Sequence, residues 1–182
     1  MNSLLDVPAI RQHAARLSVD DYHRLGELPV ELLRGNLIAK MSKSPLHTAV
    51  SDDLREILSR QLTPDLVLRS EGPLTFSDSE PEPDLAIVKG DRAAFRRSHP
   101  GTAELVIEVA VSSLEIDRVK ALIYAEAGVP EYWIVCPVEK CVEVHRQPGP
   151  QGYAERFNAG PGGVLESTAV PGVKVSLTDL LG

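Results

Sequence analysis

The spacing of apolar residues predicts a short helical region and then a β-hairpin at the start of the chain. Residues 3–27 carry apolar side chains at amphipathic helical intervals in two short pieces, with a break near Leu17–Ser18. Residues 30–41, VELLRGNLIAKM, place two apolar arms around Arg34-Gly35-Asn36. Two such arms around a turn that contains glycine are typical of a hairpin.

A longer amphipathic helix is predicted after the hairpin. Ser44 and Pro45 supply a serine N-cap and a proline at the first helical position, and both favour a helix start. The helix is expected to continue to about residue 62. Its buried stripe is predicted to contain Leu46, Val50, Leu54 and Ile57.

Short apolar runs in the rest of the chain predict strands. These runs cover residues 65–70, 84–89, 104–111, 131–136 and 141–146. The last two form a hairpin in which Cys136 and Cys141 face each other.

A helix is predicted between the third and fourth of these strands. Ser112 and Glu115 have the spacing of a capping box, and Gly128 follows Ala127 as a stop signal. A strand, a helix and a second strand in this order suggest a crossover connection. The predicted class is therefore α/β (α+β), with a mixed β-sheet core flanked by helices.

Composition places the chain among ordinary globular proteins. Its 182 residues are 43% hydrophobic, which predicts one domain with a real core. Within it we expect an N-terminal helical segment (1–28), a core (29–146) and a Gly- and Pro-rich β tail (147–182). No apolar run is long enough to cross a membrane and no secretory signal is recognisable, so a cytoplasmic protein with two reduced cysteines is expected.

The net charge of −7 limits the classes of partner. It argues against a dedicated, high-affinity nucleic-acid binder, because such proteins usually carry a basic face. It does not exclude a nuclease, because an acidic metal site counts as negative until the metal binds.

Three charged residues occupy predicted core positions. Asp84 begins an apolar strand, and Glu108 lies at the centre of LVIEVAV. An unpaired buried carboxylate is so costly that it normally takes up a proton or finds a cation. The helix after Glu108 should present one face to the sheet, and that face holds Ile116, Val119, Lys120, Ile123 and Ala127. Lys120 is therefore expected to point toward the two acids.

Two carboxylates and a lysine form a minimal set for metal-dependent phosphodiester hydrolysis. Carboxylate oxygens suit Mg²⁺ or Mn²⁺, which can activate a water molecule, and an ammonium group can stabilise developing charge or orient that water. Spacing alone slightly favours a structural ion pair between Glu108 and Lys120. A third reading is hydrolysis of a non-nucleic substrate by the two carboxylates, as in glycosidases, in which Lys120 would have no role.

Longer motifs favour the nuclease reading. Pro83-Asp84, Glu108 in an apolar strand and then Lys120 resemble the PD-(D/E)XK nuclease pattern. The segment VIEVAVSSLEIDRVKALIYAEAGVPEYWIV resembles the signature of the Uma family, a large and mainly bacterial group of restriction-endonuclease-like proteins. PEPDLAIV and VELLRGNLIAKMSKSPLHTAV are similar to its other two blocks. The resemblance covers roughly residues 18–146.

The resemblance implies a restriction-endonuclease-like core and assigns roles within it. Asp84 and Glu108 are implied as metal ligands, together with a backbone carbonyl near Val109, and Lys120 is implied as the catalytic lysine. The superfamily usually places lysine two residues after the acid, and here that position is Ala110. The resemblance implies that in this family the lysine lies on the following helix instead, at Lys120.

Three further residues are weaker candidates. Glu31 matches an acidic position of the family and would be a further ligand or a water-positioning base, or else a solvated hairpin residue. His47 lies in the first turn of a helix, where phosphate is attracted, and would contact the substrate, although capping or packing is the commoner role. Ser112 would also contact the site, although its predicted capping role suffices to explain it.

The predicted function is a metal-dependent endonuclease that hydrolyses nucleic acid, with DNA as the expected substrate and Mg²⁺ or Mn²⁺ as cofactor. A homodimer is expected, because cutting two strands usually needs two sites. The rival hypothesis is a catalytically inactive binding or scaffold protein with a nuclease fold. The acidic net charge and the lysine missing from the strand favour that rival, whereas the buried triad favours the enzyme.

Overall fold

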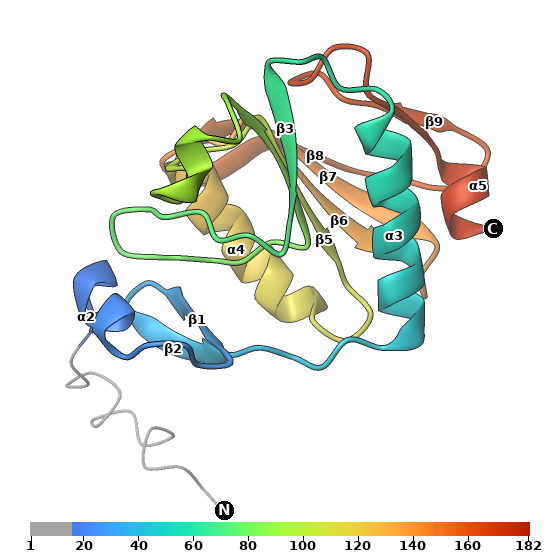
Figure 1. The fold of residues 1–182 in the computed structure, drawn as a ribbon. Helices are drawn as coiled ribbons and strands as arrows, with labels where there is room; N and C mark the ends of the chain where they lie inside the picture. Colours follow the sequence, from blue (N-terminus) through green and yellow to red (C-terminus); the bar gives the residue numbers. More distant parts are fainter. Residues whose placement is uncertain (1–15) are drawn as a thin grey trace, which may run out of the picture.

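A six-stranded mixed sheet forms the centre of the protein in the computed structural model, which describes residues 16–182 (Figure 1). In spatial order the strands are β3 (Leu66–Ser70), β4 (Leu85–Lys89), β5 (Leu105–Val109), β6 (Glu131–Cys136), β7 (Cys141–Gly149) and β8 (Gly152–Ala159). Strands β5 and β6 are parallel, and every other neighbouring pair is antiparallel. The predicted fold class is therefore confirmed.

Alternation along the strands divides the core into two layers. Leu105, Ile107 and Val109 of β5 point to one face, whereas Val106 and Glu108 point to the other. Helix α4 (Leu114–Glu126) connects β5 to β6 and covers the second face. This connection is the predicted crossover, because two parallel neighbours need a long connecting segment.

Helix α3 (Pro45–Ser59) and the C-terminal segment cover the first face (Figure 1). The C-terminal segment consists of a small hairpin, β9 (Val164–Glu166) and β10 (Lys174–Ser176), followed by helix α5 (Leu177–Leu181). Its apolar side chains join the same core cluster as those of α3. The predicted tail is therefore a structural layer of the core.

The N-terminal part contains helix α2 (Val19–Arg24) and the predicted hairpin, β1 (Val30–Leu33) and β2 (Asn36–Ala39). Arg34 and Gly35 connect the two strands with positive φ angles of 54° and 73°. Two such residues are the signature of a tight type I′ turn, whose twist matches that of the strands. The first of the two predicted helical pieces falls largely outside the described residues.

The predicted buried faces of two helices were each wrong at one position. The buried stripe of α3 is Val50, Leu54 and Leu58, whereas Leu46 in the first turn is 44% exposed. On α4 the buried face is centred on Lys120 and Tyr124, so Val119 is rotated away from it and is 60% exposed.

The predicted capping box at the start of α4 does not form. The N-cap is Ser113 and not Ser112, and its backbone (φ −103°, ψ 1°) is not in the extended conformation that side-chain capping requires. The Ser113 hydroxyl instead donates a hydrogen bond of 2.5 Å to Asp117 Oδ2.

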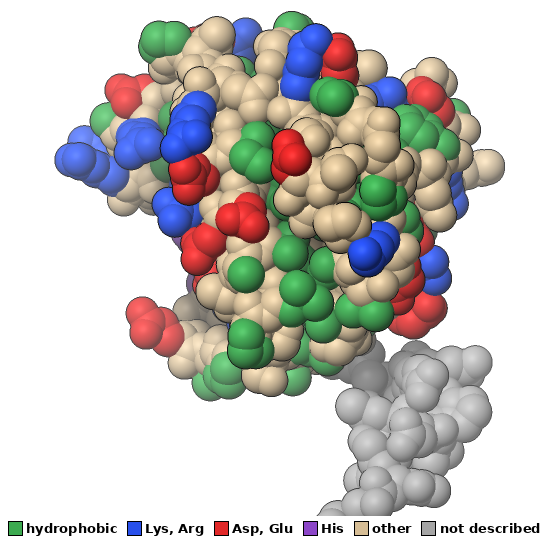
Figure 2. All heavy atoms as spheres, turned by 90° about the vertical axis from the view of Figure 1, so that its right-hand side faces the viewer, with side chains coloured by type: hydrophobic (Ala, Val, Ile, Leu, Met, Phe, Trp, Pro, Cys, Tyr) green, Lys and Arg blue, Asp and Glu red, His purple; other side chains and the backbone are tan. Residues whose placement is uncertain are grey.

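The face that carries α3 and α5 shows scattered charges of both signs (Figure 2). Hydrophobic side chains gather in its lower half, and the Lys and Arg side chains visible there lie among Asp and Glu. Within residues 16–182, no helix has both the length and the apolar character that a membrane span requires.

A buried carboxylate fastens the C-terminal segment to the sheet. Glu131, at the start of β6, has no exposed surface. One of its oxygens accepts hydrogen bonds from Trp133 Nε1 and Arg146 Nε at 2.8 and 2.9 Å. The other accepts from Ser167 Oγ, Thr168 N and Ala169 N at 2.8, 2.8 and 3.0 Å. Burial alone would raise the pKa of Glu131, but these donors hold it below its ordinary value.

Replacing this carboxylate should destabilise the protein in a pH-dependent way. Glu131→Gln presents an NH₂ group to N–H and O–H donors, so we expect the free energy of unfolding at neutral pH to fall by about 3 kcal/mol. Because the folded-state pKa is depressed, the wild-type advantage is complete above pH 4.5, the ordinary glutamate pKa, and is lost as the pH falls through the folded-state pKa. Urea denaturation across this range measures both effects. The exposed Glu139→Gln is the matched control, and an equal loss in both variants would contradict the assignment.

Candidate active site

The register of two neighbouring strands places Asp84 opposite Glu108. Strand β4 runs antiparallel to β5 with Leu85 paired to Ile107, so the next residue out, Asp84, meets Glu108. Both carboxylates lie on the α4 side of the sheet, because they share strand parity with buried residues that pack under α4, Ala86 on β4 and Val106 on β5.

Reciprocal bonds fix the two carboxylates. The Asp84 backbone N–H donates to Glu108 Oε2 at 3.1 Å, and the Val109 backbone N–H donates to Asp84 Oδ2 at 2.8 Å. Glu108 is 4% exposed and Asp84 is 9% exposed. Both acids are thus held by the backbone in a largely desolvated position.

Lys120 reaches the acids from α4, as its helical position predicted. Its Nζ lies 3.0 Å from Glu108 Oε1, 3.0 Å from Glu31 Oε1 and 3.9 Å from Asp117 Oδ1. Glu31 comes from β1, so the N-terminal hairpin contributes a carboxylate to the site and contacts α4 through Lys120. One ammonium group therefore serves three buried carboxylates.

Burial and the excess of carboxylates over ammonium groups shift the pKa values of Lys120 and Glu108. Burial alone would lower the pKa of Lys120, but Glu108, Glu31 and Asp117 outweigh burial and hold it above its ordinary value. Burial raises the pKa of Glu108 well above its ordinary value; Lys120 opposes this rise, and the carboxylates of Asp117, Asp84 and Glu31 add to it. The cluster is short of positive charge.

Tyr124 and Asp117 complete the buried part of the site. The Tyr124 hydroxyl donates to Glu108 Oε1 at 3.2 Å, and burial, followed by the Glu108 charge, raises the pKa of this phenol well above its ordinary value. Asp117, in the first turn of α4, is 3% exposed and belongs to the carboxylate cluster. Both residues lie one helical turn from Lys120, and that spacing is the sequence signal that would have found them.

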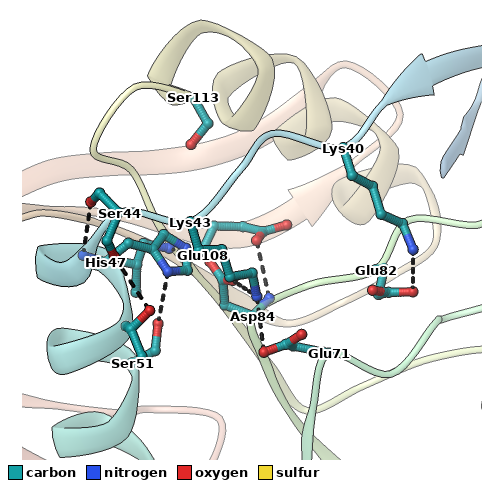
Figure 3. A network of polar contacts seen from close by, with 12 residues as sticks. Lys40, Lys43, Ser44, His47, Ser51, Glu71, Glu82, Asp84, Glu108 and Ser113 are labelled. Atoms are coloured by element: carbon teal, nitrogen blue, oxygen red, sulfur yellow. Dashed lines mark hydrogen bonds and ion pairs between the residues drawn. The ribbon is translucent and has the colours of Figure 1, made fainter. Parts of the chain in front are cut away.

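Lys43 and His47 contact the other side of Asp84 (Figure 3). Lys43 Nζ lies 3.2 Å from Asp84 Oδ1 and 3.0 Å from Glu71 Oε1. His47 Nε2 lies 3.0 Å from Asp84 Oδ2. Burial would raise the pKa of Asp84, but the His47 and Val109 hydrogen bonds lower it below its ordinary value. Burial would lower the pKa of Lys43, but Glu71 and Asp84 raise it.

These residues surround a cavity of about 100 Å³. Its lining includes five acids, Glu31, Glu82, Asp84, Glu108 and Asp117, and three lysines, Lys40, Lys43 and Lys120. The formal charges of these acids and lysines sum to −2, which is the charge that one divalent cation balances. Carboxylate oxygens are also the ligands that Mg²⁺ and Mn²⁺ prefer, so the donor set fits such an ion.

No three His, Cys, Asp or Glu side chains among residues 16–182 form a ready-made metal cage. A Mg²⁺ site in proteins typically uses one or two carboxylates together with water and substrate phosphates. The oxygens of Asp84 and Glu108 are instead engaged by lysine and histidine side chains.

The structure brings all the predicted site residues to one cavity, but Ser112 lies outside the cluster of ion pairs and hydrogen bonds that the others form. Asp84, Glu108, Lys120, Glu31 and His47 share the cluster. Ser112 lines the same cavity as an exposed residue. Lys43 carried no sequence signal, because its approach to Asp84 depends on how the chain turns between β2 and α3.

The sheet, its crossover helix and the buried acids define a protein with a nuclease-like fold. The chain belongs to the Uma2 family, described as putative restriction endonucleases, whose family model matches residues 19–178. Among solved structures, a putative nuclease from Anabaena variabilis is similar, with a TM-score of 0.74 and 21% sequence identity over 91% of this chain and 97% of that one. Among curated proteins, none matches the chain.

Removing the buried ammonium group should be costly even without metal. In Lys120→Met, three buried carboxylates lose their cation, so we expect the free energy of unfolding to fall by about 3–5 kcal/mol in chelator-treated buffer. Adding Glu108→Gln to this variant should recover at least about 1 kcal/mol, because one unpaired charge is removed. Urea denaturation measures both. Lys89→Met, at an exposed position, is the control, and an equal cost for both lysines would refute a shared buried cluster.

Proposed function

We propose that this protein is a divalent-metal-dependent endonuclease that hydrolyses phosphodiester bonds, with DNA as its substrate. The observation that carries the proposal is that the Asp84 N–H holds the Glu108 carboxylate and the Val109 N–H holds the Asp84 carboxylate, in a cavity whose acids and lysines have formal charges that sum to −2. Membership of a family of restriction-endonuclease-like proteins supports the same reaction class.

Asp84 and Glu108 would hold Mg²⁺ or Mn²⁺. When bound, such an ion lowers the pKa of a coordinated water and stabilises negative charge on the phosphate. Backbone bonds fix the two carboxylates beforehand, so little reorganisation is needed at the moment of reaction.

Lys120 would take the part of the lysine that the strand lacks at Ala110. Its ammonium group is held between Glu108 and Glu31, where it would supply positive charge to a reacting phosphate and protons to orient an attacking water. Tyr124 keeps Glu108 in position through its hydroxyl. Glu31 fixes Lys120 at 3.0 Å and would be a further carboxylate able to accept a proton from that water.

A homodimer would give the protein two such sites. Cleavage of both strands of a duplex needs two attacks on opposite strands, and two-fold symmetry supplies them with one kind of subunit. We therefore expect linear plasmid to form together with nicked plasmid when the protein is dimeric in light-scattering measurements.

Cleavage assays with supercoiled plasmid and single-stranded DNA test the proposal. With Mg²⁺ or Mn²⁺ present, Asp84→Asn and Glu108→Gln should each reduce cleavage at least about hundredfold, because each removes a charged ligand without changing its shape. Lys120→Met should reduce the rate by a similar factor, provided that circular dichroism shows a folded protein. Chelation should abolish the activity, and Glu139→Gln should leave it unchanged.

Two results would contradict the assignment. Cleavage that survives both carboxylate substitutions would remove Asp84 and Glu108 from the reaction. Absence of cleavage by the wild-type protein with every metal tested would favour the rival, a binding protein with a nuclease fold.

A further inference from the structure

Asp84 receives two kinds of donor, and only one kind belongs to the sheet. The Val109 N–H is part of β5 and holds Oδ2 at 2.8 Å. Lys43 and His47 come from the segment between β2 and the first turn of α3, and they approach Oδ1 and Oδ2 at 3.2 and 3.0 Å. The sheet therefore fixes one edge of the carboxylate, while Oδ1 is engaged by a lysine from outside the sheet.

The two lysines of the site differ in how firmly they are held. The Lys120 side chain is 7% exposed and contacts buried carboxylates only. The Lys43 side chain is 37% exposed, extends from a segment without regular structure and already touches Glu71, a surface residue whose side chain is 61% exposed. Lys43 can therefore leave Asp84 and keep a partner, whereas Lys120 cannot leave without stranding buried charge.

We propose that Lys43 is an exchangeable cation: it neutralises Asp84 in the metal-free protein, leaves when a divalent ion binds there, and then contacts a phosphate of the nucleic acid. This inference rests on the proposed function. An ammonium group 3.2 Å from Oδ1 and a divalent ion bound to the same oxygen would repel each other at close range, so the two compete.

The position of Lys43 suits the second part of this role. It lines the cavity together with Lys40, and their side chains are 37% and 35% exposed, so these are the lysines of the lining that an incoming polyanion can reach. Figure 3 shows Lys43 between Asp84 and Glu71, with Lys40 directed to Glu82 instead. A displaced Lys43 would stand beside the scissile phosphate, and Lys40 would remain paired.

Binding of Mn²⁺ to the chelator-treated, full-length protein tests the exchange without any catalysis. We expect Lys43→Met to bind Mn²⁺ about tenfold more tightly than the wild type, measured by calorimetry and by the electron paramagnetic resonance of free Mn²⁺. Lys40→Met is the matched control, because it removes a lysine of equal exposure that does not touch Asp84, and its affinity should stay within about twofold. Lys43→Arg keeps the charge and should also stay close to the wild type.

Two more measurements complete the design. In an Asp84→Asn background, Lys43→Met should give no gain in Mn²⁺ affinity, because the contested carboxylate is gone. At saturating Mn²⁺, Lys43→Met should cleave plasmid at least about tenfold less efficiently in kcat/KM despite its tighter metal binding, because a phosphate contact is lost.

The outcomes separate this inference from the proposed function. Mn²⁺ binding to the wild type with no gain in Lys43→Met would overturn the exchange and leave the metal site standing. Tighter metal binding with undiminished cleavage would overturn the phosphate contact. Failure of every variant to bind Mn²⁺ would overturn both the metal site and the exchange.

Discussion

The arrangement of the site depends on keeping several carboxylates and one ammonium group out of water together. Desolvation of a single unpaired charge costs several kcal/mol, so the buried carboxylates of this cluster depend on the Lys120 ammonium group to be stable in their positions. Strand parity brings Asp84 and Glu108 to the same side of the sheet, and α4 must then present a cation to that side. Packing and charge balance thus both require the helix that connects β5 to β6 to place a lysine on the face that it packs against the sheet.

Much of this arrangement could be predicted from the sequence, because the relevant signals are local. Alternation in LVIEVAV places Glu108 on a defined face of a strand, and helical periodicity places Lys120 on the facing side of the next helix. The hairpin at Arg34-Gly35 follows from its turn residues in the same way. Periodicity failed for Val119, because the centre of a helical face depends on how the helix sits on its sheet, and that is a tertiary property.

The contacts that could not be predicted join segments distant in the chain. Lys43 reaches Asp84 across 41 positions, and Glu31 reaches Lys120 from the N-terminal hairpin. Sequence periodicity does not predict such long-range contacts, because they depend on the path of irregular segments. Glu131 is a similar case: its sequence neighbours mark it as a strand residue, but the donors to one of its oxygens come from residues 167–169.

The C-terminal layer has a practical consequence for any shortened version of the chain. Val173, Leu177 and Leu181 lie in the same apolar cluster as Trp133 of the central sheet. A protein ending after β8 would present that hydrocarbon surface to solvent and would leave one oxygen of the Glu131 carboxylate without its donors from residues 167–169. Insolubility of such a truncated protein would reflect an uncovered sheet and would carry no information about catalysis.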